Sequence, residues 1–464
     1  MNRIALIALL TLCKVSFVSA GGILTNTNQS AHFIRMVARD ASTQIDAAYT
    51  NPAGLVKLKD GLHFSFSNQS AFQTRTITST FVPFASFGGD ATKLYEGKAS
   101  APLVPSLQAA YKTGKWVLSG NFAVTGGGGK ATFNRGLASF ESMVAVLPVA
   151  MTNGMGLETS NYSVDAYMTG SSFIYGLQLG GSYAINDMFS AYAGFRLNIV
   201  NNGYEGYLKN IKINPKHPQL NPNGDMLSAV DFFTTIGQPA LVDLVADREI
   251  DNKQSGWGVA PILGLNFNYK GLNIGAKYEF KTSLDVESKT INGKDGGLDQ
   301  FKDGVNTPHD IPALFSIGAS YQITPQLLAS VGYHHFFDKE AQMANDKQKL
   351  LDGGTNEYLA GLEYRINRLF LVSAGAQMTR YGVTDDYLTD LSFSINSYSI
   401  GLGGAVNVSE NVMLNIGYFW TTYSDWSKEN TNYAKIPTTE TYLSGKDVFL
   451  RTNKVFAVGV DFSF

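Results

Sequence analysis

Residues 171–185 read SSFIYGLQLGGSYAI, and this stretch decides the fold class. Large apolar residues occupy nearly every second position, at Phe173, Tyr175, Leu177, Leu179, Tyr183 and Ile185. Small or polar residues stand between them, at Gly176, Gln178, Gly180, Ser182 and Ala184. A period of two over this length predicts a β-strand longer than the globular mean of roughly 5–6 residues, with one face suited to lipid and the other to a polar lumen.

The same alternation recurs along the chain. Fourteen segments show it: residues 61–74, 103–112, 115–125, 171–185, 188–209, 256–270, 272–287, 310–323, 327–338, 355–366, 369–381, 393–408, 412–424 and 448–464. Only alternate residues of a membrane barrel meet lipid, and an even strand count is typical of bacterial outer-membrane barrels. The sequence therefore predicts an all-β fold, a 14-stranded antiparallel transmembrane β-barrel over residues 61–464.

Connections between the predicted strands alternate in length. Every second one is a tight pair of turn-forming residues: Thr113-Gly114, Asn186-Asp187, Lys270-Gly271, Thr324-Pro325, Asn367-Arg368 and Ser409-Glu410. The intervening connections are long and polar. Outer-membrane barrels have short periplasmic turns and long outer loops, whereas a globular sandwich has no reason to alternate in this way.

Both ends of the chain indicate export to the outer membrane. Residues 1–20 are predicted to be a cleaved signal peptide, with Arg3, an apolar run at 4–12 and a small-residue site at 18–20. The last predicted strand ends on Phe464 and resembles the segment that the barrel assembly machinery reads. We therefore expect that machinery and outer-membrane lipid as partners. The alternative is the buried last strand of a soluble β-protein.

Composition excludes several function classes. The formal net charge of −2 argues against nucleic acid as a partner. The six histidines show no metal-ligand spacing, and the adjacent His334 and His335 would face opposite sides of a strand. No convincing Ser/His set and no phosphate-binding glycine loop is present. We expect no enzymatic activity, no cofactor and no metal site.

The residues before the first predicted strand form a separate unit, 21–60. They contain no period-two run but combine charges and small residues with apolar anchors: Ile34, Met36, Val37, Ile45 and Leu55. The bore of a fourteen-stranded barrel is wide enough to need filling if it must not leak. We predict that residues 21–60 form an N-terminal plug in the lumen. A disordered periplasmic tail is the alternative.

Part of this unit resembles a known family. The stretch from Ala38-Arg39-Asp40-Ala41 to Asn51-Pro52-Ala53-Gly54-Leu55 is similar to the plug of the FadL/TodX family of outer-membrane long-chain fatty acid and hydrocarbon transporters. The motif Asn51, Pro52 and Ala53 precedes the first strand, as in that family, but the detailed resemblance covers only positions 38–55. It implies passive uptake of a fatty acid or another hydrophobic small molecule. It also implies a plug that shifts and a kinked third strand that opens a lateral path into the bilayer.

Two of the expected outer loops are apolar, around residues 137–151 and 230–245. The candidates for capturing a hydrophobic ligand are Leu137, Phe140, Met143, Val144, Leu147, Phe232, Phe233, Ile236, Leu241 and Leu244. Apolar, helical segments outside the bilayer indicate a landing surface or groove. Packing on each other to cap the barrel is an equally good interpretation, and the two are compatible.

Charged residues and glycines supply the remaining candidates. Arg196, Lys277 and Lys281 are predicted to face the lumen, where one of them could hold a carboxylate head group; pairing with nearby acids is the favoured alternative. Gly120 and Gly126 are candidates for the strand kink. The run 126–129 taken by itself favours the start of a flexible loop.

Two other functions remain open at this stage. One is a general diffusion porin for polar solutes, and the other is a structural or adhesive outer-membrane barrel. The pattern does not distinguish fatty acids from aromatic hydrocarbons or other lipids as the substrate.

Overall fold

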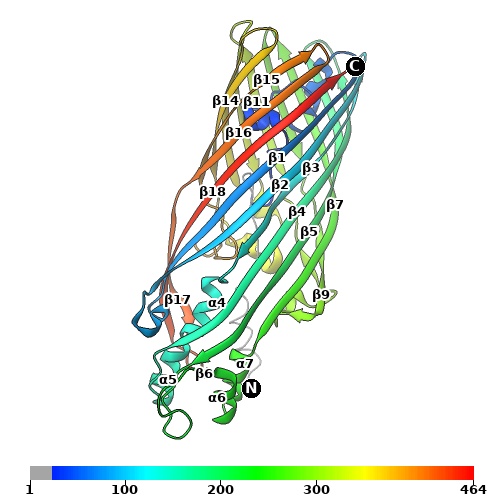
Figure 1. Ribbon diagram of the computed structural model, residues 1–464. Helices are drawn as coiled ribbons and strands as arrows, with labels where there is room; N and C mark the ends of the chain where they lie inside the picture. Colours follow the sequence, from blue (N-terminus) through cyan, green and yellow to red (C-terminus); the bar gives the residue numbers. More distant parts are fainter. Residues whose placement is uncertain (1–22) are drawn as a thin grey trace.

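The computed structural model describes residues 23–464, so the predicted signal peptide lies outside the described residues. Fourteen antiparallel strands close into a barrel (Figure 1). They are β1 (Gly61–Thr80), β2 (Thr92–Thr113), β3 (Trp116–Phe133), β4 (Tyr162–Ala184), β5 (Phe189–Ile213), β7 (Arg248–Tyr269), β8 (Leu272–Glu279), β11 (Leu314–Gln322), β12 (Leu327–Phe336), β13 (Thr355–Arg365), β14 (Phe370–Arg380), β15 (Ser397–Ser409), β16 (Val412–Tyr423) and β18 (Tyr442–Ser463). Pairing of β18 with β1, from His63 opposite Ser463 to Thr80 opposite Lys446, closes the circle. The predicted fourteen-stranded barrel is confirmed.

Four shorter strands extend this wall: β6 (Leu227–Ser228), β9 (Asp285–Asp295), β10 (Asn306–Pro308) and β17 (Trp426–Lys435). Several strands are longer than their apolar pattern; β2, for example, begins at Thr92 rather than at 103. About 9–11 residues suffice for a tilted strand to cross a bilayer. Beyond that depth no lipid selects apolar side chains, so the period-two signal fades while the backbone pairing continues.

Side chains alternate across the wall as the sequence predicts. On β4, Leu177 and Leu179 are 41% and 43% exposed on the outer face, whereas Gln178 between them is fully buried on the lumen side. Within residues 23–464, no helix combines the length and apolar character needed to cross a membrane. The tight turns lie at one end of the barrel, together with the C-terminus (Figure 1).

The long connections form a cap at the other end. They carry α4 (Ala138–Ala145), α5 (Leu147–Met155), α6 (Ala229–Thr235) and α7 (Pro239–Val245), together with the 3-10 helices η2 (Val82–Phe84), η3 (Ser86–Gly88), η4 (Asp299–Phe301), η5 (Asp338–Glu340) and η6 (Ala344–Leu350). The largest hydrophobic cluster of the described chain holds these loops together. The prediction that the two apolar loops are helical is confirmed.

Residues 23–60, the N-terminal segment, precede β1 and run inside the barrel toward the tight-turn end (Figure 1). The segment contains α2 (Ala31–Arg35), α3 (Ala47–Thr50) and the 3-10 helix η1 (Pro52–Lys57). Inward glycines of the wall make room for it. A Cβ on Gly332 would lie 2.2 Å from Oδ2 of Asp40, and one on Gly401 would lie 2.4 Å from the carbonyl oxygen of Ile34.

Candidate functional site

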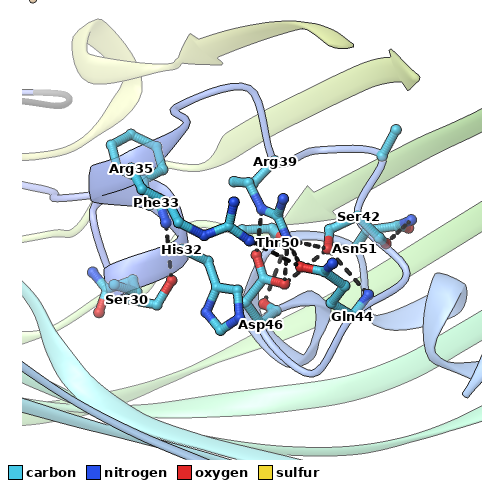
Figure 2. A network of polar contacts seen from close by, with 12 residues as sticks. Ser30, His32, Phe33, Arg35, Arg39, Ser42, Gln44, Asp46, Thr50 and Asn51 are labelled. Carbon is cyan, nitrogen blue, oxygen red and sulfur yellow. Dashed lines mark hydrogen bonds and ion pairs between the residues drawn. The ribbon is translucent and has the colours of Figure 1, made fainter. Parts of the chain in front are cut away.

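The N-terminal segment is held in shape by its own polar side chains (Figure 2). The Arg39 guanidinium donates two hydrogen bonds of 2.7 Å to the Asp46 carboxylate and one of 2.9 Å to Oγ of Ser42. Burial alone would raise the pKa of Asp46, but the adjacent positive charge of Arg39 outweighs it and holds that pKa well below its usual range. This buried, paired network gives a short segment with only brief helices one defined conformation.

The Asn-Pro-Ala motif fastens the segment to one side of the barrel. Asn51 donates from Nδ2 to the carbonyl oxygen of Ser42 and to Oδ1 of Asn266 on β7. The next two carbonyl oxygens accept hydrogen bonds of 2.7 Å from serines of the wall: Ser182 of β4 bonds to Pro52, and Ser190 of β5 bonds to Ala53. The motif residues therefore anchor the segment to β4, β5 and β7.

Three buried contacts between ionisable side chains fasten the segment to the opposite side. Arg35 pairs with Glu363 of β13 at 2.5 Å, and His32 lies 2.9 Å from Asp461 of β18. Asp40 lies 2.8 Å from His334 of β12. Removing one partner of a buried pair typically costs about 3–5 kcal/mol, because the other charge is left without compensation. Displacing this part of the segment as a body would break all three contacts at once.

The predicted head-group candidates all contact protein atoms. Arg196 pairs with Glu279, and its guanidinium lies 4.8 Å from the centre of the Tyr49 ring. Lys277 donates a hydrogen bond of 2.8 Å to the carbonyl oxygen of Tyr49, and Lys281 forms an ion pair of 2.7 Å with Asp310. These contacts favour the pairing role for Arg196 and Lys281, and a structural role for Lys277, which holds the backbone and ring of Tyr49.

A gap in the barrel wall lies between β2 and β3. The two strands pair over residues 107–113 with 116–122, and again over 97–99 with 131–133, with a register break between the two stretches. The break coincides with Pro102 and Pro105 on β2, which have no N–H to donate to the ladder. On the other edge, the pairing of β3 with β4 shifts at Gly126 and again by Gly129.

The N-terminal segment pairs with β3 beside this gap. Asn26 donates its backbone N–H to the carbonyl oxygen of Thr125 at 2.8 Å, and Gly127 donates to Leu24 at 3.0 Å. A Cβ on Gly126 would lie 2.3 Å from the carbonyl oxygen of Leu24, so this close approach requires glycine. The segment thus forms an isolated antiparallel bridge, from Thr25 to Gly126, on the edge of β3.

Two expectations about the glycines need correction. The run 126–129 is not the start of a flexible loop, because it lies inside β3 and is followed by regular pairing to Phe133. Gly120 does not interrupt the strand either; it pairs regularly with Ala109 on β2 and Leu179 on β4. The irregularity begins at Gly126.

Three cavities lie at the gap, among the outer loops and inside the barrel. The first, of about 650 Å³ including its mouth, lies at the gap and is lined by Asn28, Gln73, Val104, Gly128, Lys130 and Asn453 among others. The second, of about 600 Å³, is an apolar groove among the outer loops, lined by Phe140, Met143, Ile250, Leu298, Phe301 and Leu391. The third, of about 550 Å³, is an inner cavity lined by Leu24, Tyr204, Phe301, His309, Met343 and Lys347. Phe301 borders both the groove and the inner cavity.

The predicted capture residues divide into two groups. Phe140 and Met143 of α4 line the outer groove. The other eight pack in or against the large hydrophobic cluster of the cap: Leu137, Val144, Leu147, Phe232, Phe233, Ile236, Leu241 and Leu244. For these eight the packing interpretation describes the structure.

Sequence reasoning missed Phe301 and Leu24. Phe301 stands in a polar connection where no periodic signal marked it, and Leu24 lies next to the predicted cleavage site. Pro105 was a usable signal, because a proline inside a predicted central strand argues against regular pairing on both edges.

No protein-family model and no curated protein sequence matches the chain. Solved structures do match. A FadL homologue from Pseudomonas aeruginosa superposes with a TM-score of 0.64 at 12% identity, over 97% of this chain and 100% of that one. The toluene transporter TodX of Pseudomonas putida superposes with a TM-score of 0.55 at 15% identity, over 91% of this chain and 95% of that one. The toluene transporter TbuX of Ralstonia pickettii gives 0.52 at 15% identity, over 91% and 94%. In fold, the chain therefore resembles the FadL/TodX family over more than nine-tenths of its length.

Proposed function

We propose that the chain is a passive outer-membrane channel for the uptake of long-chain fatty acids or other hydrophobic small molecules. The observation that carries the proposal is the interrupted wall between β2 and β3, beside which the N-terminal segment pairs with β3. The toluene transporters TodX and TbuX, which have the same fold, support it.

The cavities outline a route in three steps. A ligand adsorbs in the outer groove at Phe140 and Met143. It passes Phe301 into the inner cavity, whose wall includes Leu24. It then leaves through the gap cavity between β2 and β3 into the bilayer. Burial of each CH₂ contributes about 0.8 kcal/mol, so a long chain can be held at each stage without an external energy source.

The step that opens the gap is local. Residues 23–28 contact β3 through the two backbone hydrogen bonds described above, and contact the barrel elsewhere through single hydrogen bonds such as those of Ile23 with Asp338 and Asn28 with Gln69. A typical hydrogen bond contributes a net ~0.5–1.5 kcal/mol, and each is weaker than a buried ion pair. The rest of the N-terminal segment is fixed by three buried contacts between ionisable side chains and by the Asn51 motif. The plug movement is therefore a release of residues 23–28, while residues 30–57 stay in place as a plug.

The alternative to lateral exit is a route along the barrel axis, and polar groups line that route. A cavity of about 750 Å³ on the tight-turn side of the segment is lined by Arg39, Ser42, Gln44, Gln326, Glu363 and Arg365, with few apolar groups. An apolar chain gains little there, because it would desolvate charged groups without pairing them. A ligand that leaves through the gap between β2 and β3 instead enters the lipid directly.

Uptake measurements test this function. Cells that lack their own channel should take up radiolabelled oleate or toluene faster when they produce the protein. Proteoliposomes should not swell in sugar solutions, because the N-terminal segment fills the bore. Fast sugar entry would favour the diffusion porin. Unchanged uptake, together with no lipid in the purified protein by mass spectrometry, would favour the structural or adhesive barrel.

A further inference from the structure

The β2 side of the gap carries a bulge. The register of β1 with β2 shifts between Gln69 and Ala71, so that Pro102 and Leu103 of β2 together stand opposite Ser70 alone. A bulge of this kind leaves backbone groups without ladder partners and bends the strand that carries it. In Figure 1, β1, β2 and β3 lie side by side, so the bulge faces β1 on one edge of β2 and the gap lies along the other edge.

Two polar side chains of β1 bond to the backbone of the bulge. Asn68 accepts a hydrogen bond of 3.1 Å at Oδ1 from the backbone N–H of Val104, and its Nδ2 donates to the carbonyl oxygen of Pro102 at 3.5 Å. Ser70 donates from Oγ to the same carbonyl oxygen at 2.7 Å. The bulged part of β2 is therefore tied to β1, on the side away from β3. We call Asn68 and Ser70 the β1 clamp.

The β1 clamp lies on the lipid-facing side of the wall. Its two residues follow Phe66 and precede Phe72 on the outer face of β1, and these two aromatic side chains are 49% and 52% exposed. Hydrocarbon offers no hydrogen-bond partner, so every backbone N–H and C=O group that faces it must be bonded within the protein. Polar side chains in this band are also costly unless they are bonded. Each clamp side chain meets both requirements by bonding to the bulge.

The backbone of the bulge has a second possible partner across the gap. Residues 123–130 of β3 have no ladder partner on β2. Ala101 and Val104, which flank the bulge, line the gap cavity opposite Gly128 and Lys130. If the β1 clamp were lost, the freed N–H of Val104 and carbonyl of Pro102 could be satisfied only by moving toward β3. That movement would narrow the gap.

We propose that Asn68 and Ser70 are positioning residues for lateral exit: they hold the bulge of β2 against β1 and so keep the gap between β2 and β3 open. This inference rests on the proposed function, because it assigns a role in the last step of the proposed route. One side of the gap is then a fixed frame formed by β1 and β2. Only the other side, where residues 23–28 meet β3, opens and closes.

Uptake of radiolabelled oleate over a range of concentrations tests the role in transport. The variant N68L/S70A should lower the saturated rate about tenfold, the factor that corresponds to the loss of about two hydrogen bonds. The half-saturating concentration should not change, because the outer groove shares no residue with the β1 clamp or the gap cavity. S70T keeps the hydroxyl group and should retain the rate, whereas S70A should lose part of it.

A distance across the gap tests the geometry without transport. The chain's one cysteine, Cys13, lies in the predicted signal peptide, so nitroxide labels can be placed on cysteines at chosen sites. Leu103 of β2 and Phe122 of β3 are both exposed on the outer face. The distance between labels at these two positions should become shorter in N68L/S70A than in the otherwise unchanged protein. If the double variant does not fold, S70A is measured in the same way and should show a smaller change in the same direction.

The matched control is T76V. Thr76 lies on the same outer face of β1, but it pairs regularly with Glu96 of β2 and Leu450 of β18. This variant should change neither the saturated rate nor the distance between the labels. Heat-dependent migration on gels checks that equal amounts of folded barrel are compared.

Three results would overturn the role of the β1 clamp. They are an unchanged label distance in N68L/S70A, an equal fall in the saturated rate in T76V, and a shorter distance with an unchanged rate. The third result would also contradict lateral exit through this gap. If the unchanged protein takes up no oleate, the proposed function itself has failed for that substrate, and the label distance still decides whether the clamp positions β2.

Discussion

Asp40 of the N-terminal segment and His334 of β12 lie 2.8 Å apart, between Oδ1 and Nε2, although 294 residues separate them in the chain. The other ring nitrogen of His334 lies 2.8 Å from Oε2 of Glu357 on β13. One imidazole thus joins the segment inside the barrel to two strands of its wall, and all three side chains are buried. This contact is one of the three buried contacts that hold residues 30–57 in place independently of the bridge between Thr25 and Gly126.

Asp40→Asn should therefore loosen the N-terminal segment. Loss of the carboxylate leaves the His334–Glu357 contact without its third member, a change on the order of 3 kcal/mol for a buried pair. Unfolding of the refolded barrel in urea measures the loss, and sugar entry into proteoliposomes reports whether the bore now leaks. Asp60→Asn is the matched control, because Asp60 pairs with Lys112 at an exposed position and its removal should change neither readout. An unchanged D40N protein would mean that the segment is held elsewhere.

How far the sequence predicts this molecule depends on the range of each interaction. Period-two alternation is local, so the strand at 171–185 was found from its own residues. The Asn51 motif was also found, because it is contiguous. The Asp40–His334 contact was not, since neither residue carries a local signal of its partner. Gly120 stands alone and Gly126 begins a run of four glycines, but neither pattern shows which one approaches the N-terminal segment. That close approach, at Gly126, is visible only in the folded chain.

Acidity should stabilise the cap. Burial, aided by the nearby charge of Asp447, raises the pKa of Asp390 to about 6, although Asp390 accepts a 2.7 Å hydrogen bond from the backbone N–H of Ser139 at the start of α4. The folded protein therefore binds a proton more tightly than the unfolded chain, whose Asp pKa is about 3.9. The destabilisation is fully present above pH 6 and is relieved as the pH falls from about 6 to about 4.

Asp390→Asn tests this assignment. It should flatten the pH dependence of the free energy of unfolding between pH 4 and 6 by an amount on the order of 2–3 kcal/mol. The measurement is urea unfolding at several pH values. Burial also raises the pKa of Asp338 to about 6. The D390N protein should therefore keep a residual pH dependence of its free energy of unfolding. If the free energy of unfolding of D390N depends on pH as strongly as that of the unchanged protein, other groups are responsible for the titration.

Gly126→Ala should displace residues 23–28 from β3. The added methyl group would lie 2.3 Å from the carbonyl oxygen of Leu24, a backbone atom that must move. We expect faster exchange of the amide hydrogens of Asn26 and Gly127, and faster uptake of a hydrophobic substrate. Gly120→Ala is the control, because its nearest contact is the movable end of the Leu179 side chain at 3.0 Å. Slower uptake in G126A would mean that residues 23–28 assist transport rather than closing the gap.

Phe140 and Met143 line the outer groove, and replacing both with serine should weaken capture without altering later steps. The two side chains offer apolar surface to a ligand, and burial of that surface contributes about 25 cal/mol per Å². At low ligand concentration the initial uptake rate should fall several-fold, while at saturation it should approach that of the unchanged protein. Concentration dependence of uptake separates the two cases. Phe233→Leu is the control, because Phe233 is fully buried in the cap away from the groove and its loss should lower stability rather than shift the half-saturating concentration. A fall in the saturated rate with an unchanged half-saturating concentration would show that Phe140 and Met143 act after capture.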